Sequence, residues 1–319
     1  MADHPGPPVP DRPGHYVTAF GLLQRASELR ERRTPFVIAT VVRVERPASA
    51  KPGDAALLLP DGTIEGFVGG ACADTTVRAQ GLRQLTAGQS ALLRIAPGVS
   101  SASEGVVTVP NPCLSGGTLD IFLEVVRPPM LVHVFGETPV ARALAVLGRE
   151  AGWEIRLVTD PAAPVAPDAS AVVVASQGGH EVPVLAAGLQ AGASYVGLVA
   201  SRRRGAAVAE SLDLDDEQAK RFHTPAGLDI GARTPGEIAV SILAEIISVT
   251  SLHPATAAGG AASGAAAAAA DPTDPVCGMT VAAAPATPQL RRDGTAVYFC
   301  SPACRDAFAA DPERYTHSL

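Results

Sequence analysis

Apolar, strand-like runs alternate with helical segments through the middle of the chain, and this alternation constrains the fold most strongly. The runs cover residues 131–135, 155–159, 171–175 and 195–200. A helix pattern from Val140 to Ala151, ended by Gly152, separates the first two runs. Strands joined by such crossovers pair in parallel and wind in one hand. The sequence therefore predicts a Rossmann-like domain over 129–252, with a last helix that starts at Pro235.

The residues before this region predict a mixed α/β domain over 15–128. The expected elements are a helix from Tyr16 to Arg33, a buried strand from Phe36 to Val44, a hairpin around Pro60-Asp-Gly62, a helix from Asp74 to Ala87, and strands over 91–95 and 119–126. The pair Pro128-Pro129 marks the end of this domain. The predicted fold class is therefore α/β, with a mixed domain followed by a parallel-sheet domain.

Three further segments complete the chain. Residues 1–14 are rich in proline and predict a disordered arm, and residues 253–273 are mostly Ala and Gly, which predicts a flexible linker. Residues 274–319 form a module of under fifty residues. Such a module is too small to depend on a hydrophobic core alone, so a bound metal would help it to fold.

The composition argues against several classes of protein. A net charge of −7 over 319 residues disfavours nucleic-acid binding, which normally requires a basic face. No uncharged apolar run reaches membrane-spanning length, and the N-terminus lacks the pattern of a signal peptide, so we expect a cytoplasmic protein without membrane insertion. The five cysteines are irregularly spaced, which favours thiol chemistry or metal binding over a disulfide framework.

The segment Gly66-Phe-Val-Gly-Gly-Ala-Cys-Ala-Asp74 places a cysteine just after a glycine pair. Because Gly69 and Gly70 have no Cβ, the backbone there can approach a ligand closely. A Cys72 thiolate in such a turn can bind a soft metal or attack sulfur, and Asp74 can orient the site or take a proton. The alternative is a buried structural cysteine beside a helix that Asp74 caps.

A second glycine pair lies in Asn111-Pro-Cys-Leu-Ser-Gly-Gly-Thr118. In the functional interpretation, Cys113 is a second thiol that faces the same cleft, and Gly116 and Gly117 admit a ligand to the backbone. In the other interpretation, the segment is an ordinary turn before an edge strand. The sequence does not separate the two.

Gly136 ends the first strand of the predicted Rossmann-like domain and precedes a helix, where free amides can bind an anion. Asp160 ends the next strand, where dinucleotide folds have a ribose-binding carboxylate. Thr138 and Ala141 stand in place of the fingerprint glycines, so a Rossmann-like fold without a nucleotide is the alternative.

Polar residues follow two later strands of the same domain. Ser201 and Arg202 can hold a pyrophosphate through charge-assisted hydrogen bonds, or they belong to a solvated helix start. His180, in Ser176-Gln-Gly-Gly-His180, is a further candidate ligand or proton carrier, although a lone loop histidine is more often neither.

Several of these motifs resemble the XdhC/CoxF family, whose members are accessory factors that mature molybdenum hydroxylases. The resemblance covers about residues 16 to 250 and is carried by Gly66–Asp74, by Glu45-Arg-Pro-Ala-Ser-Ala-Lys-Pro-Gly53 and by the C-terminal signature from Pro225 to Ile247. Two departures are mild. Ala71 replaces a third glycine, and Asp74 stands where Glu is more usual.

The resemblance implies that the chain binds the molybdenum–pterin cofactor, with its cytosine dinucleotide form as one option. It further implies that the chain protects the sulfurated cofactor and delivers it to a hydroxylase of the xanthine dehydrogenase or carbon monoxide dehydrogenase type. The implied partners are this hydroxylase apoprotein and a cofactor sulfurase, and a homodimer is left open.

The C-terminal module resembles the YHS domain, a small metal-associated module. The resemblance rests on Cys277 in Asp-Pro-Val-Cys-Gly-Met and on Cys300 and Cys304 in Tyr-Phe-Cys-Ser-Pro-Ala-Cys. A helical turn would place the last two thiolates on one side. Three thiolates suit Zn(II) or Cu(I), with His317 as a candidate fourth ligand. The module then either brings a metal such as Cu(I) to the cofactor or forms a structural zinc knuckle; the alternative is a metal-free module with reduced thiols.

Two other functions remain open. An NAD(P)-binding oxidoreductase would use the Rossmann-like domain, but its glycine fingerprint is degraded and no convincing acid/base pair is evident. A metal-binding or redox-sensing protein would use the YHS cysteines alone, which leaves the first 250 residues without a purpose.

Overall fold

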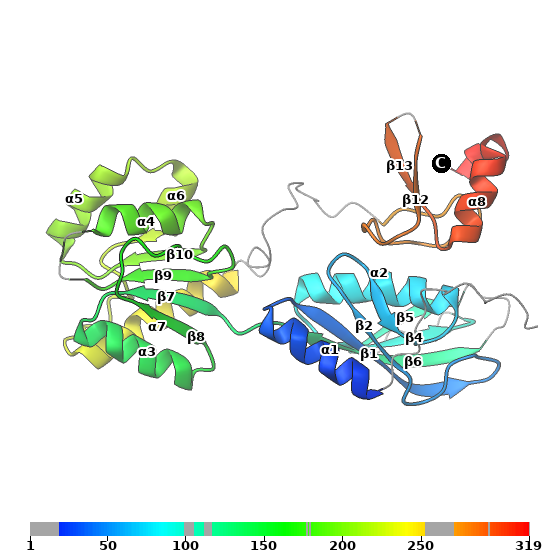
Figure 1. The fold of residues 1–319 in the computed structure, drawn as a ribbon, viewed down its shortest axis with the longest axis horizontal. Coiled ribbons are helices and arrows are strands. Elements are labelled where there is room, and N and C mark those ends of the chain that lie inside the picture. Colours follow the sequence, from blue (N-terminus) through cyan, green and yellow to red (C-terminus); the bar gives the residue numbers. More distant parts are fainter. Residues whose placement is uncertain are drawn as a thin grey trace, which may run out of the picture. The chain divides into compact units, whose positions relative to one another are not determined.

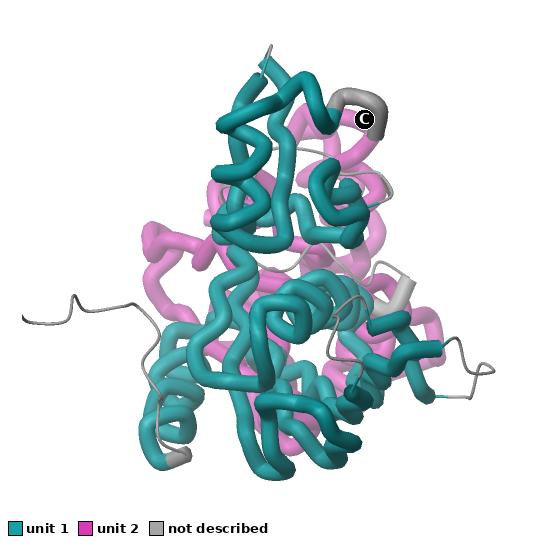
Figure 2. Tube along the Cα trace, turned by 90° about the vertical axis from the view of Figure 1, so that its right-hand side faces the viewer, with its two compact units in different colours: residues 1–128, 266–319 teal, residues 129–265 magenta. Residues whose placement is uncertain are grey.

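The computed structural model describes residues 19–98, 105–111, 117–176, 178, 180–252, 271–292 and 294–318. The chain divides into two compact units. One contains residues 1–128 and 266–319, and the other contains residues 129–265 (Figure 2). The C-terminal module therefore belongs to the same unit as the N-terminal domain.

A six-stranded sheet forms the first unit, in the order β3-β2-β1-β6-β4-β5 (Figure 1). Its strands are β1 (Phe36–Glu45), β2 (Ala55–Leu58), β3 (Ile64–Gly66), β4 (Ala91–Ala96), β5 (Val106–Pro110) and β6 (Thr118–Val126). All neighbouring pairs are antiparallel except β4 with β5. The sequence predicted the hairpin of β2 and β3 but missed β5, an edge strand that ends in a proline.

Side chains of β1 alternate between the two faces of this sheet. Val37 and Ala39 pack in the core under helix α2 (Ala71–Ala87), whereas Phe36 and Ile38 pack with helix α1 (Ala19–Glu31). Each face of the sheet is thus covered by one of the two helices.

Helix α2 begins three residues earlier than the sequence predicted. Its N-cap is Gly70, which has an extended backbone and no side chain to cap the helix. The interpretation of Asp74 as the cap is therefore wrong, and Asp74 lies inside the first turn, where a carboxylate interacts favourably with the helix dipole. The helix ends as expected at Gly88, which adopts the left-handed conformation.

A five-stranded sheet forms the second unit, in the order β11-β10-β9-β7-β8. The strands are β7 (Leu131–Phe135), β8 (Glu154–Val158), β9 (Ala171–Val174), β10 (Tyr195–Leu198) and β11 (Phe222–His223). Every neighbouring pair is parallel, which confirms the predicted Rossmann-like winding. The sequence missed β11 because two residues show no pattern.

Helices cover both faces of the parallel sheet (Figure 1). Helices α3 (Pro139–Glu150) and α7 (Pro235–Leu252) share a core with one face, and α4 (Glu181–Gln190) and α5 (Arg202–Leu212) pack on the other. All four residues of β9 are consequently buried, as is typical of a central parallel strand. The short helix α6 (Asp216–Arg221) precedes β11.

The C-terminal module contains a hairpin of β12 (Gln289–Arg292) and β13 (Thr295–Tyr298), then helix α8 (Pro302–Ala310) and a 3₁₀ helix η1 (Pro312–Ser318). Val297, Phe299 and Phe308 form its small core. A bridge pairs Thr273 with Thr280, so regular structure begins before residue 274.

Candidate functional site

The first glycine pair shapes the start of α2. Gly69 has a φ of +145°, and a Cβ there would lie 2.8 Å from the Cβ of Ala73. Cys72 is half-buried in the first turn, two residues after the Gly70 cap and next to Ala73. The glycines thus allow a tight entry to the helix that places the thiol at its positive end.

Asp74 occupies an unusual environment in the same turn. Its Oδ1 is buried and has no hydrogen-bond partner in the described part of the chain. Burial raises the pKa of Asp74 to about 6, although the nearby charge of Arg78 opposes this shift. Burial also lowers the pKa of Arg78, whose Nε donates to the carbonyl oxygen of Gly62 at 2.7 Å. A carboxyl with this pKa changes its charge near neutral pH.

The second glycine pair lies against the loop that follows β1. A Cβ on Gly117 would lie 2.1 Å from the carbonyl oxygen of Pro47, so only glycine fits there. The carbonyl oxygen of Gly117 accepts a hydrogen bond from Asn111 Nδ2 at 2.6 Å. The nearest neighbour of a Cβ on Gly70 would be Ser49 Oγ, at 3.9 Å. The loop after β1 therefore contacts both glycine turns. Cys113 and Gly116 lie outside the described residues.

Four potential metal ligands meet in the C-terminal module. Their ligand atoms all lie within 4.8 Å of one another, and they belong to Asp274, Cys277, Cys300 and Cys304. Cys300 Sγ is 3.5 Å from the Sγ atoms of both Cys277 and Cys304. Thiolates around a tetrahedral Zn(II) are separated by about 3.8 Å, so the three sulfurs are close to the spacing that such a metal requires.

The structure adds two details to the predicted cluster. Cys300 precedes the Ser301 cap of α8 and therefore does not share a helical turn with Cys304; the two thiols approach each other across the helix start. Asp274 also stands beside the thiols, although the sequence analysis did not propose it, and the side chain of His317 lies outside the described part of the chain. The signal for Asp274 was its position three residues before Cys277, in a short turn.

Without a metal, Cys277 and Cys300 favour the protonated thiol. Burial raises the pKa of Cys277 to about 11, and burial together with the hydrogen bond to Asp274 raises the pKa of Cys300 further. Burial would also raise the pKa of Asp274, but hydrogen bonds from the amides of Cys300 and Val276, each 2.8 Å long, outweigh it and lower this pKa. A bound cation would replace the thiol protons.

The YHS-like module (residues 271–318) contacts α2 and the turn between β2 and β3. Three polar contacts cross between them: Thr75 Oγ1 to Cys300 O at 2.9 Å, Ala286 N to Asp61 O at 3.0 Å, and the Arg83–Asp271 ion pair. Ala79 and Leu82 pack there against Ala282 and Ala284. Asp271 and Thr273 thus belong to ordered structure, although the sequence predicted a flexible linker through residue 273.

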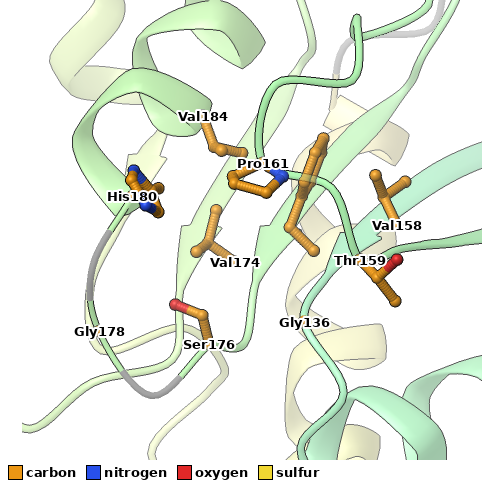
Figure 3. A pocket seen from close by; sticks show the side chains of 10 residues that line it. Gly136, Val158, Thr159, Pro161, Val174, Ser176, Gly178, His180 and Val184 are labelled. Atoms are coloured by element: carbon orange, nitrogen blue, oxygen red, sulfur yellow. The ribbon is translucent and has the colours of Figure 1, made fainter.

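The second unit has a cavity at the carboxyl ends of β7 and β9, where the strand order reverses (Figure 3). Ligands of open α/β sheets bind at such switch points. The cavity measures about 190 Å³ and is lined by Gly136, Thr159, Ser176 and His180, among others. A Cβ on Gly136 would lie 2.4 Å from the carbonyl oxygen of Ala175, so glycine is required for the close approach of the two loops.

Three other predicted residues have local roles. Asp160 Oδ1 accepts a hydrogen bond from the amide of Ala162 at 2.9 Å, and Ser201 caps α5. Arg202 forms an exposed ion pair with Asp229 at 3.0 Å. The described residues that line the cavity include Thr159 and Pro161, on either side of Asp160, but none of these three.

A polar cluster beside the cavity was not predicted. Ser176 Oγ donates to Glu181 Oε1 at 2.9 Å, and Arg204 forms an ion pair with the same buried carboxylate. The sequence showed Ser176 and Arg204 in separate motifs, but only the fold brings them to one sheet edge.

The fold and these clusters define a class of protein with a cysteine-bearing α/β domain, a Rossmann-like domain and a thiolate module. The chain matches the XdhC and CoxI family over residues 29–96, the XdhC Rossmann domain over 132–246 and the YHS domain over 272–318. It therefore belongs to the XdhC and CoxI family and carries a C-terminal YHS domain.

Two relatives come from Escherichia coli (strain K12). The uncharacterized protein YqeB is 27% identical over 266 residues, which cover 74% of this chain and 47% of YqeB. The molybdenum cofactor insertion chaperone PaoD is 21% identical over 263 residues, which cover 67% of this chain and 83% of PaoD. The chain thus spans about half the length of YqeB.

A short match and a solved structure extend the comparison. A stretch of 42 residues is 50% identical to part of a copper-transporting P-type ATPase from Rhizobium leguminosarum bv. viciae. The stretch covers 13% of this chain and 5% of the ATPase. A xanthine dehydrogenase structure from Bacillus halodurans has a TM-score of 0.37 and 17% identity, and the match covers 72% of this chain and 96% of that one. Among the helices that the structure describes, none has the length and apolar character needed to cross a membrane.

Proposed function

We propose that this protein binds the molybdenum–pterin cofactor, protects its sulfurated form and inserts it into a molybdenum hydroxylase of the xanthine dehydrogenase or carbon monoxide dehydrogenase type. The observation that carries the proposal is the Cys72 turn, in which glycines and a half-buried thiol form the start of α2 within a domain of the XdhC and CoxI family. The likeness to PaoD, a molybdenum cofactor insertion chaperone, supports it.

The chemistry of the turn suits this cargo. The glycine backbone of residues 69–70 admits a ligand to the amides of the first turn, and the thiol is a soft donor for molybdenum or for the sulfur that the cofactor carries. The loop after β1 connects this turn to Gly117, so residues 116–117 and Cys113 are proposed to belong to the same site. The proposed partners are the hydroxylase apoprotein and a cofactor sulfurase in the cytoplasm, with a homodimer as the proposed assembly.

We further propose that the YHS domain holds a soft metal ion through Cys277, Cys300 and Cys304, with Asp274 as the fourth ligand. The sulfur separations of 3.5 Å fit a tetrahedral site. Thiolates favour Cu(I) or Zn(II), and the likeness of 42 residues of this chain to part of a copper-transporting ATPase favours copper.

A second candidate function is nucleotide binding in the Rossmann-like domain. The cavity at the strand switch point favours it, since Gly136 lines the cavity in the turn before α3, and dinucleotide folds bind phosphate at such a turn. In this proposal, Asp160 contacts a ribose and Ser201 and Arg202 contact phosphate. Saturable binding of NAD(P)H with turnover of a substrate would make the chain an oxidoreductase, whereas binding without turnover fits a chaperone.

The first experiment is to purify the full chain anaerobically from molybdate-replete cells and to measure pterin fluorescence and molybdenum after denaturation. The wild type is expected to retain both, and the Cys72→Ala variant is expected to lose them. A matched Ser211→Ala variant, altered in an exposed side chain of α5, should keep its pterin. A wild-type protein free of pterin would overturn the proposal.

The metal proposal has its own test. The wild type should bind one Cu(I) or Zn(II) per chain, and Cys300→Ser and Cys304→Ser should lower this stoichiometry, whereas Cys72→Ser should not. Unchanged stoichiometry in both cluster variants would refute the metal site.

A further inference from the structure

A cavity of about 250 Å³ lies where the YHS domain contacts α2. Asp74, Thr75 and Arg78 line it from α2, and Cys300 and Ser301 line it from the YHS domain. Neither wall is sufficient alone, so the cavity exists only while the two parts are in contact. Its position joins the two clusters described above, because one wall contains Asp74 from the Cys72 turn and the other contains a cysteine of the metal cluster.

Arg78 places a guanidinium cation in the wall of this cavity, beside the carboxyl group of Asp74. Its guanidinium makes one hydrogen bond among the described residues, from Nε to the carbonyl oxygen of Gly62. A guanidinium carries five donors, and burial without partners is unfavourable, which is why the pKa of Arg78 is lowered. Asp74 attracts Arg78 through space but forms no close ion pair with it in the described chain. An anion that enters the cavity would supply the missing acceptors.

Cys300 connects the cavity to the metal cluster. Its amide donates to Asp274 Oδ2 at 2.8 Å, and its carbonyl oxygen accepts from Thr75 Oγ1 at 2.9 Å. The backbone of this residue is thus fixed on one side by a cluster carboxylate and on the other side by α2. A ligand in the cavity would therefore lie beside the thiolate that the proposed metal uses.

The volume limits the size of the ligand. Pockets for drug-sized molecules measure roughly 300–1,000 Å³, so this cavity accepts a smaller group. A metal centre with a few oxygen or sulfur atoms fits within about 250 Å³, whereas a complete pterin dinucleotide does not. The ligand is then an anion of small size that tolerates neighbouring sulfur.

We propose that this cavity binds a small oxo- or thio-molybdenum anion, presented as the metal end of the cofactor, with Arg78 as its counter-charge and the YHS domain completing the site. The inference rests on the proposed function, since it identifies the part of the cofactor that enters the cavity. Free molybdate is a second source of the same chemistry.

The test uses molybdate and tetrathiomolybdate as probes, with binding to the purified full chain measured by equilibrium dialysis and molybdenum analysis. The wild type should bind one molybdenum per chain, and Arg78→Gln should lower the affinity at least tenfold. Arg78→Lys, which keeps the charge, should retain most of the affinity. Arg83→Gln is the matched control, because Arg83 lies on the same helix but pairs with Asp271.

An Arg78→Gln variant that melts like the wild type and binds both probes with wild-type affinity would overturn the inference. A second measurement separates the two sources. If pterin purified with the chain falls in Arg78→Gln, the anion is the metal end of the cofactor; if only free molybdate binding falls, the cavity is a site for the free ion. Pterin absent from the wild type would instead refute the proposed function, while the dialysis result still decides whether the cavity binds the anion.

Discussion

The hydrogen bond between Thr75 and Cys300 predicts a measurable change in the contact between the YHS domain and α2. Thr75 is 2% exposed, and its hydroxyl group lies 2.9 Å from the carbonyl oxygens of both Ala71 and Cys300. Thr75→Val removes the hydroxyl group but keeps the branched shape, so little packing is lost. The carbonyl oxygen of Cys300 then loses its partner across the contact.

The expected cost follows from the hydrogen bond alone. A neutral hydrogen bond contributes about 1 kcal/mol, and an acceptor left buried and unpaired costs roughly 1–3 kcal/mol. The lower figure multiplies the population of the separated form by about fivefold. Thr76→Val is the matched control, because Thr76 is also buried and bonds to the carbonyl oxygen of Cys72 within α2 alone.

The assay is hydrogen–deuterium exchange at the amide of Ala286, which bonds to the carbonyl oxygen of Asp61 across the same contact at 3.0 Å. When opening is fast and reversible, the exchange rate follows the population of the open form. Thr75→Val should therefore accelerate exchange at this amide at least fivefold, and Thr76→Val should leave it unchanged. Equal rates in both variants would show that the hydroxyl group does not hold the YHS domain to α2.

Two further predictions concern the second unit. Gly136→Ala should destabilise it by at least about 2 kcal/mol in thermal unfolding, because the new Cβ would clash with the backbone at a φ of +118°. Gly152→Ala is the control and should cost less, because Gly152 has a φ of +81° but open space around it. Equal losses of stability in the two variants would contradict the argument from close approach. Burial would raise the pKa of Glu245, but hydrogen bonds from His223 and Tyr195 outweigh it, so this pKa lies below the ordinary 4.5. The stabilisation is therefore present above pH 4.5 and lost as the pH falls through the lowered pKa, and Glu245→Gln should remove this part of the acid sensitivity; identical acid unfolding curves would refute it.

Local patterns were sufficient to predict most of the fold. The strands β7, β9 and β10 are short apolar runs buried on both faces, and such runs are visible without any knowledge of their partners. The start of α2 was not predictable in the same way. Gly70 caps the helix without a side chain, so the usual cap signal was absent and Asp74 took its place in the prediction.

The candidate sites depended more on contacts between distant residues. The three YHS cysteines could be named from their spacing, but Asp274 could not be added to them, because its carboxylate reaches Cys300 only through the turn that precedes Cys277. The sequence likewise predicted only part of the environment that Asp74 and Arg78 share on α2. The carboxylate of Asp74 was noted, but the burial that raises its pKa arises from the packed helix.

The contact between the YHS domain and α2 was hidden for a different reason. A run of Ala and Gly predicts a flexible tether, and a tether by itself says nothing about where its two ends are bound. Here the module that follows the tether is held by specific groups, since Cys300 contacts both Asp274 of the module and Thr75 of α2. Any change at the metal cluster that moves the backbone of Cys300 must therefore also strain its bond to α2, within one residue of Asp74. If the cluster and the Cys72 turn bind the ligands proposed above, binding at either place alters the free energy of binding at the other.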